Sequence, residues 1–138
     1  MSIKFKEKLE KIEQTLSILA DSSAKGKPIV VEGKKDEKSL RALGICGSVL
    51  TVKTGGKSFL EAIAEIENLR AQEVVLLLDF DRRGKEGTLR LKKDLERTKI
   101  MVNTRFWRDL EALVGRDIRC IESLPSYILT LEQKAAYV

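Results

Sequence analysis

The chain has 138 residues, of which 43% are hydrophobic and 34% charged, which suits one compact domain and argues against disorder, collagen-like repeats or a coiled coil alone. No apolar run approaches the roughly 18–20 residues that cross a bilayer, and the N-terminus lacks a signal-peptide core, so we expect a cytoplasmic protein without membrane association. The chain contains no histidine, which excludes His-based triads, His general bases and His-containing metal sites.

Neither cysteine, Cys46 or Cys120, has a CxxC partner, which argues against a zinc knuckle or a thioredoxin-like pair. We expect both side chains to be buried as small hydrophobic groups. Lys, Arg and Glu are abundant while Asn and Gln are few, a composition typical of thermophilic proteins.

The first predicted element is an amphipathic helix over residues 3–20, in which apolar side chains recur at steps of three and four. We expect this apolar stripe to pack on the sheet, with a dimer seam as the alternative. The stripe consists of Phe5, Leu9, Ile12, Leu16 and Leu19.

After a break at residues 25–28, the continuous apolar run Ile29–Val31 predicts a short buried strand. Asp36 is predicted to cap a helix that runs to Leu43, and Gly44 is the signal that ends this helix.

A second strand is predicted over residues 48–52, and the glycine-containing segment 54–56 predicts a turn. Ser58 and Glu61 form a capping-box pattern, which predicts a helix that continues to about Arg70.

The run Val74–Leu78 is the strongest strand prediction, because it is apolar at every position, as a central parallel strand should be. A helix over 84–98, a strand over 100–102 and two helices near 105–114 and 123–136 complete the predicted elements.

The alternation of strands and helices predicts an α/β protein, a single doubly wound domain with an approximately four-stranded parallel sheet flanked by helices. We expect residues 1–138 to form one domain. Its core is expected over about 27–103, preceded by the N-terminal helix and followed by a helical extension over about 104–138.

Polar residues follow three of the predicted strands. They are Glu32, the turn at 54–56, and Asp79 with Asp81 on either side of Phe80. The carboxyl ends of parallel strands meet at one edge of the sheet, where ligands bind in open α/β folds. We therefore expect these groups to share one site.

Asp79 and Asp81 are separated by one residue after an apolar strand, so both carboxylates are expected to face one point beyond the sheet. Two close carboxylates repel unless a cation lies between them, and oxygen ligands favour Mg²⁺ or Mn²⁺. Glu32 is a candidate third ligand. The alternative is a polar loop, with Glu32 paired to Lys34 or Lys35.

Two motifs resemble those of the Toprim domain family. The first is Val-Val-Glu-Gly-Lys-Lys-Asp over residues 30–36, and the second is Leu-Asp-Phe-Asp-Arg-Arg-Gly over residues 78–84. Their glycines, Gly33 and Gly84, permit a positive φ or a close backbone approach. The resemblance covers about residues 27–103 and is greatest to the nuclease that matures 5S ribosomal RNA and to small archaeal Toprim proteins.

The resemblance implies catalytic and metal-site roles for Glu32, Asp79 and Asp81, with Mg²⁺ or Mn²⁺ acting in phosphoryl transfer. Glu32 would act in proton transfer or at the metal. Many family members have an acidic residue directly after the second glycine, whereas Lys85 stands there in this chain and Glu86 comes one place later.

Gly55, Gly56 and Lys57 precede a predicted helix, and their amides are candidates for contact with one phosphate. The spacing is not that of a P-loop, which would require glycine at Thr51. A turn that merely opens the helix is the alternative.

Positive charge is concentrated in residues 82–108, where ten basic side chains face three acidic ones. The segment carries +7, which leaves −2 for the rest of a chain whose total is +5. Such a segment suits a nucleic-acid partner, and a solvated helix face is the alternative. Trp107 within it is expected to pack in the core. The expected nucleic-acid contacts are Lys34, Lys35, Arg82, Arg83, Lys85, Arg90, Lys92 and Lys93.

The leading hypothesis is a Mg²⁺-dependent enzyme that handles phosphodiesters in RNA or DNA, most simply a nuclease. The second is a module that binds nucleic acid or a nucleotide through metal without turnover, within a larger assembly. A homodimer is compatible with both hypotheses.

Overall fold

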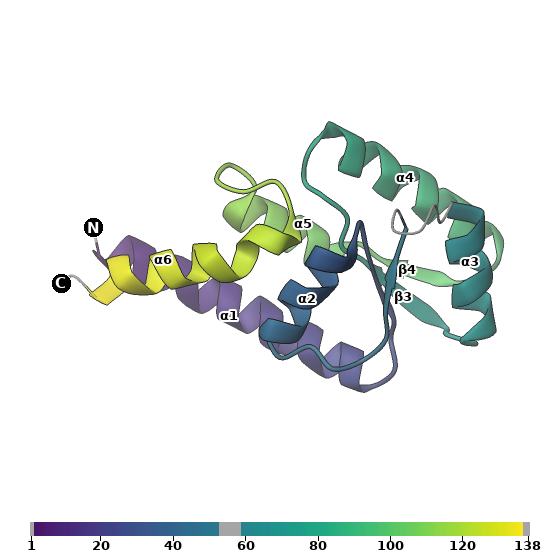
Figure 1. Ribbon diagram of the computed structural model, residues 1–138, viewed down its shortest axis with the longest axis horizontal. Coiled ribbons are helices and arrows are strands. Elements are labelled where there is room, and N and C mark those ends of the chain that lie inside the picture. Colours follow the sequence, from purple (N-terminus) through teal and green to yellow (C-terminus); the bar gives the residue numbers. More distant parts are fainter. Residues whose placement is uncertain (1, 53–58, 137–138) are drawn as a thin grey trace.

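The structure of the chain is a computed structural model that describes residues 2–52 and 59–136 (Figure 1). Four parallel strands form one sheet in the order β2-β1-β3-β4, so β1 and β3 are central. Val30 of β1 lies opposite Leu50 of β2 and Leu76 of β3. The predicted α/β class with a four-stranded parallel sheet is confirmed. The strands are β1 (Ile29–Val31), β2 (Val49–Thr51), β3 (Glu73–Leu76) and β4 (Met101–Asn103).

The helices follow the predicted order, with small shifts at their ends. The first helix continues to Ala24 and stops before Gly26, whose φ of +96° favours glycine. The second helix starts at Lys34 with Gly33 as its N-cap, so the prediction that Asp36 is the cap is wrong. The helices are α1 (Ser2–Ala24), α2 (Lys34–Ala42), α3 (Phe59–Asn68), α4 (Arg82–Arg97), α5 (Arg105–Val114), a 3-10 helix (Ile121–Ser123) and α6 (Leu124–Ala136).

The sheet separates two hydrophobic cores, because successive residues of a strand point to opposite faces. One face packs against α1, α2, α5 and α6, and the other packs against α3 and α4. The first core takes Ile29, Val31, Val75 and Leu77 from β1 and the β3 segment, and the second takes Val30, Val74, Leu76 and Leu78.

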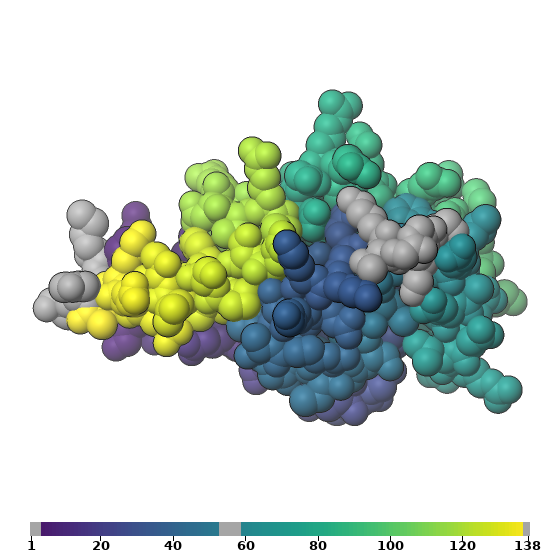
Figure 2. Space-filling view, in the orientation of Figure 1, coloured from purple at the N-terminus to yellow at the C-terminus, as the bar shows by residue number. Residues whose placement is uncertain are grey.

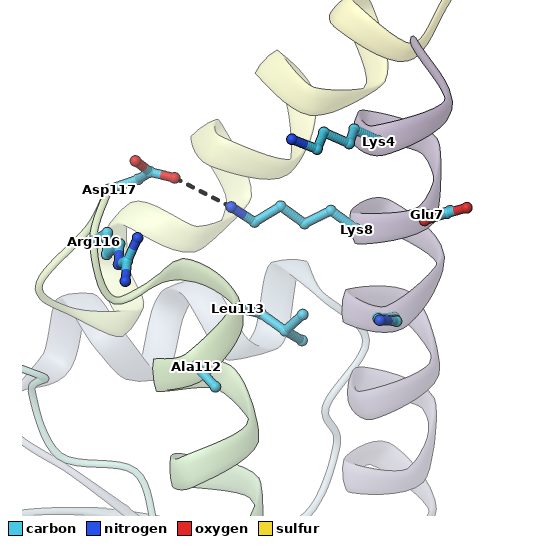
Figure 3. A pocket seen from close by; sticks show the side chains of 8 residues that line it. Lys4, Glu7, Lys8, Ala112, Leu113, Arg116 and Asp117 are labelled. Carbon is cyan, nitrogen blue, oxygen red and sulfur yellow. Dashed lines mark hydrogen bonds and ion pairs between the residues drawn. The ribbon is translucent and has the colours of Figure 1, made fainter. Parts of the chain in front are cut away.

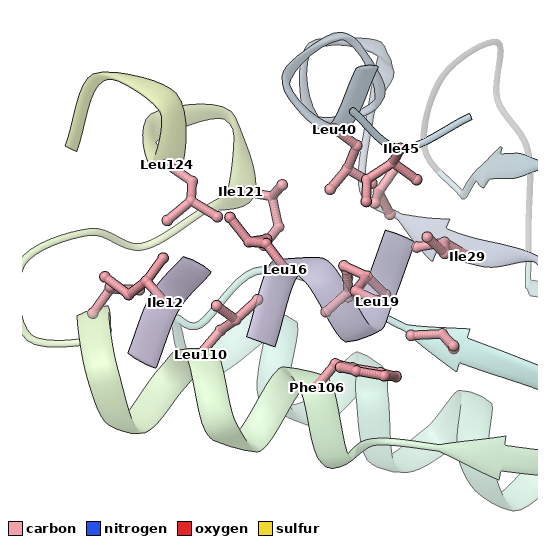
Figure 4. Packing of buried hydrophobic residues seen from close by; sticks show 14 of the residues in the cluster. Ile12, Leu16, Leu19, Ile29, Leu40, Ile45, Phe106, Leu110, Ile121 and Leu124 are labelled. Atoms are coloured by element: carbon pink, nitrogen blue, oxygen red, sulfur yellow. The ribbon is translucent and has the colours of Figure 1, made fainter. Parts of the chain in front are cut away.

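The apolar stripe of α1 is buried within the chain. Ile12 and Leu19 are fully buried, and both lie in the core that includes Ile29 of β1. Figure 4 shows this stripe beside Leu110 of α5 and Leu124 of α6, so it packs on helices as well as on the sheet. The stripe is therefore part of the core of one chain.

The C-terminal helices cover the same side of the sheet as α1. In Figure 1, α1 and α6 run together beyond the sheet and both termini lie at that end. In the space-filling view the yellow-green C-terminal segment lies against the blue α2 segment (Figure 2). No helix in the described part of the chain is both long and apolar enough to cross a bilayer.

Trp107 and the cysteines differ in how they meet expectation. Trp107 is half-buried against the first core, its ring centroid lies 6.0 Å from that of Phe80, and its Nε1 donates to the Leu78 carbonyl at 2.9 Å, as expected for a core residue. Cys120 is half-buried and Cys46 is exposed, so the prediction of two buried cysteines is wrong. In the connection after α2, Ile45 takes the inward position and leaves Cys46 at the surface.

Candidate metal centre at the carboxyl edge of the sheet

The two sequence motifs meet where the central strands end. Glu32 follows β1 directly, and Asp79 lies three residues beyond β3. The backbone N–H of Asp79 donates to Glu32 Oε2 at 3.3 Å, which joins residues 47 positions apart. Glu32 is only 7% exposed, and Asp79 is half-buried. The edge therefore brings an acidic residue of each motif into contact.

Asp81 is oriented by the helix that follows it. It is the N-cap of α4, with an extended backbone, and its Oδ1 accepts a hydrogen bond from the Gly84 N–H at 2.8 Å. The expectation that Asp79 and Asp81 point the same way assumed that the strand continued to residue 78. Because β3 ends at Leu76, strand alternation does not extend to either aspartate.

The first turn of α4 lies directly on the backbone of Asp79. A Cβ at Gly84 would collide with the Asp79 carbonyl, so glycine is required for this approach. Gly33 is different, because its φ of −153° is open to any residue and its N–H donates to Asp36 Oδ2 at 3.1 Å. The close-approach role expected of the motif glycines is therefore confirmed at Gly84, and Gly33 has no positive φ.

Asp36 connects the first motif to the C-terminal extension. This carboxylate is 6% exposed and accepts hydrogen bonds from the N–H of Gly33 and, at 2.9 Å, from that of Glu122. Burial raises the pKa of Asp36, and the nearby charges of Glu122 and Glu32 add to this effect, while the two hydrogen bonds oppose it. A structural bridge at Asp36 was not foreseen from its place in the motif.

The segment that precedes α6 forms one wall of the edge. The Phe80 N–H donates to the Arg119 carbonyl at 2.6 Å, between Asp79 and Asp81 in the chain. Burial raises the pKa of the Cys120 thiol, and the charges of Glu122 and Asp79 raise it further. The edge therefore includes residues 119–122. Sequence reasoning missed them because no local pattern reports contacts over such distances along the chain.

The donor set at this edge fits a hard divalent cation. Glu32, Asp79 and Asp81 supply only carboxylate oxygens, which Mg²⁺ and Mn²⁺ prefer. Within residues 2–52 and 59–136, no three Asp, Glu or Cys side chains form a ready-made metal cage. Mg²⁺ is commonly held by one or two carboxylates together with water and substrate phosphates, so the adjacent Glu32 and Asp79 suffice as a starting pair.

Cations flank the acidic edge on two helices. Lys34 and Lys35 are exposed in the first turn of α2 and line a hollow of about 410 Å³. Arg82, Arg83 and Lys85 are exposed at the start of α4. Both helices begin at the carboxyl edge, because each follows a central strand.

The remaining predicted contacts do not share one surface. The Arg90 guanidinium lies 5.5 Å from the Phe59 ring centroid, on the α3 side of α4. Lys92 lines a separate hollow of about 360 Å³ together with Arg105 and Arg108. Lys93 is exposed on α4. The predicted phosphate contacts Gly55, Gly56 and Lys57 lie outside the described residues.

Comparison with known proteins supports the assignment of both motifs. A family model described as the Toprim domain matches residues 26–104. A UPF0292 protein of Methanosarcina barkeri is 34% identical over 134 residues, which cover 96% of this chain and 91% of the relative. A UPF0292 protein of Methanocaldococcus jannaschii is 37% identical, covering 88% of this chain and 91% of its own.

A solved structure of an Aquifex aeolicus protein has a similar fold. It superposes with a TM-score of 0.66 at 26% identity, covering 80% of this chain and 94% of the other. The region matched by the family model contains the whole sheet and both acidic motifs.

Proposed function

Because this chain belongs to the Toprim domain family, whose members are associated with divalent metals and nucleic acid, we propose that it is a Mg²⁺-dependent nuclease. The observation that carries the proposal is the hydrogen bond from the Asp79 N–H to Glu32 Oε2, which joins the two motifs at the edge. The exposed cations at the starts of α2 and α4 support a phosphodiester substrate.

In this proposal Glu32, Asp79 and Asp81 hold Mg²⁺ or Mn²⁺. The ion, when bound, supplies charge stabilisation at a phosphate and a more acidic water molecule. Glu32 moves a proton through a carboxylate oxygen that is already fixed by the Asp79 N–H. Arg82, Arg83 and Lys85 orient the strand by contacts to phosphates.

A metal-dependent binding module without turnover is the second candidate. The observation that favours it is that Asp81 already caps α4 through Oδ1, so the third carboxylate of the motif set also has a structural task. Both candidates use the same edge and the same cation, and they differ only in product formation.

The Glu32→Gln substitution separates the two functions, because glutamine keeps the shape of the side chain and removes the proton carrier. Labelled structured RNA and single-stranded DNA are incubated with the wild type and the variant in Mg²⁺, in Mn²⁺ and in EDTA. We expect product only with metal, and turnover of the variant lower by about 10²–10⁴-fold. We expect metal-dependent binding, measured by anisotropy, to fall less than about tenfold.

Glu10→Gln provides the matched control, since Glu10 is exposed on α1, away from the edge, and its variant should keep wild-type turnover. Equal loss of turnover and binding in Glu32→Gln would make Glu32 a metal ligand and remove its role as a proton carrier. Metal-dependent binding without product from any substrate would establish the binding module instead.

A further inference from the structure

A second cationic hollow lies between α1 and α5, away from the carboxyl edge. It has a volume of about 480 Å³, and its charged lining consists of four cations and two anions (Figure 3). We call it the α1–α5 groove. Its charged residues are Lys4, Glu7, Lys8, Lys11, Arg116 and Asp117.

The three lysines form a line along α1. Their spacing of four and three residues places them on one side of the helix, and the rise of 1.5 Å per residue separates Lys4 from Lys11 by about 10 Å. In Figure 3 the Lys4 and Lys8 side chains extend from α1 toward the connection that carries Arg116 and Asp117. A line of charges of this length suits more than one phosphate of a strand.

Lys8 and Asp117 form the structural clasp of the groove. Lys8 Nζ lies 3.3 Å from Asp117 Oδ2, and the Tyr127 hydroxyl donates to the same oxygen at 2.6 Å. The Lys8 ammonium also lies 5.5 Å from the Tyr127 ring centroid. Because Asp117 is engaged with Lys8 and Tyr127, the positive charge of Lys4, Lys11 and Arg116 is left in excess over Glu7.

One short connection joins this groove to the metal edge. Arg116 and Asp117 line the groove, and the carbonyl of Arg119 accepts the hydrogen bond from Phe80 between the two motif aspartates. A strand that leaves the edge along this connection reaches the groove. The four cations come from α1 and the segment after α5, which lie outside the basic segment 82–108.

We propose that the α1–α5 groove binds backbone phosphates of the nucleic-acid strand that occupies the metal edge, independently of base sequence. The proposal rests on the nucleic-acid part of the proposed function. An acidic peptide on the same path would meet the carboxylates of Glu32 and Asp79, whereas a phosphodiester strand meets them with a divalent cation in between.

The double substitution Lys4→Ala with Lys11→Ala tests the groove and leaves the Lys8–Asp117 contact in place. The control is Lys6→Ala with Lys25→Ala, which removes the same charge from exposed positions in or just after α1 that do not line the groove. Labelled single-stranded DNA of about 4 and about 16 nucleotides is titrated by anisotropy at several salt concentrations, in EDTA and in Mg²⁺.

With the longer strand, we expect the slope of log K against log salt to fall by about 1.4 in the groove variant, or about 0.7 per phosphate contact. The short strand, which does not span edge and groove, should bind both double variants with equal slopes. Equal slopes for the groove and control variants with the longer strand would overturn the proposal. Polyglutamate that competes as well as DNA of equal charge would assign the groove to acidic peptides and also overturn it.

The Asp79→Asn background separates this inference from the proposed function. In EDTA this background disables the metal edge, and the groove variant should still lower the slope for the longer strand. A wild-type protein that forms no product, but whose slope depends on Lys4 and Lys11, would contradict the nuclease and support the groove. Product formation with a slope that is unaffected by the groove variant would do the reverse.

Discussion

Gly84 determines how closely α4 can approach the acidic edge. The Asp79 carbonyl occupies the space that a Cβ would need, and the same turn donates the Gly84 N–H to Asp81. A single atom at this position therefore acts on two motif aspartates at once. Gly87, one turn later in α4, has ordinary room, since its Cβ would lie 3.3 Å from a Phe59 ring carbon and 3.4 Å from a Leu78 methyl.

We expect Gly84→Ala to lower the free energy of unfolding by about 1–3 kcal/mol or more, because the backbone of Asp79 must move. Gly87→Ala is the matched control. It should be neutral or raise the free energy of unfolding by up to about 1 kcal/mol, because alanine is the better helix former. Urea denaturation of the three proteins measures both effects. A Gly84→Ala variant as stable as the wild type would contradict the close approach.

At the scale of elements, α4 presents its basic residues on more than one side. Its buried face consists of Gly84, Thr88, Leu91 and Leu95, so the charges are spread over the solvent side. At about 100° per residue, Arg90 and Lys92 lie about 160° apart around the helix axis. The hollow that contains Lys92 also contains Glu73 and Glu96, which offset its charge.

A strand that follows one side of α4 should therefore distinguish these two residues. We expect Arg90→Ala to lower the slope of log K against log salt by about 0.7–0.9, and Lys92→Ala to leave it unchanged. Arg90→Lys keeps the charge and should keep most of the slope. Equal decreases in the two alanine variants would mean that the strand wraps around α4.

At the scale of the whole molecule, the C-terminal extension completes the first core. Ile121 and Leu124 are fully buried in the cluster that contains Ile12 of α1 and Val31 of β1. The extension also reaches the edge through the bond from the Glu122 N–H to Asp36. These contacts favour one cooperative unit that includes both ends of the chain.

We predict a single unfolding transition in urea, with coincident midpoints by far-UV circular dichroism and by Trp107 fluorescence. Ile121→Ala should lower the free energy of unfolding by roughly 2–5 kcal/mol, and Ile66→Ala, a fully buried site in the second core, should do the same. Each variant should shift both signals together. Separate midpoints, or an Ile121→Ala effect on only one signal, would divide the chain into two units.

The amino-acid sequence alone determines the order of strands and helices and the place of both acidic motifs. Apolar runs such as Ile29–Val31 and the stripe of α1 report local periodicity, which the burial of these residues confirms. The prediction failed where a local rule was extended too far. Strand alternation was applied to Asp79 and Asp81, although β3 had already ended and the start of α4 orients Asp81.

Only the tertiary structure decides which distant segments share the edge and the groove. The Glu122 bond to Asp36 joins residues 86 positions apart, and the Lys8 bond to Asp117 joins residues 109 apart. Periodicity and propensity act over a few neighbouring residues, whereas these pairs form only after the helices have packed on the sheet. Charge counted along the chain therefore identifies the basic segment of α4, and the cations of the α1–α5 groove become a group only when α1 packs beside α5.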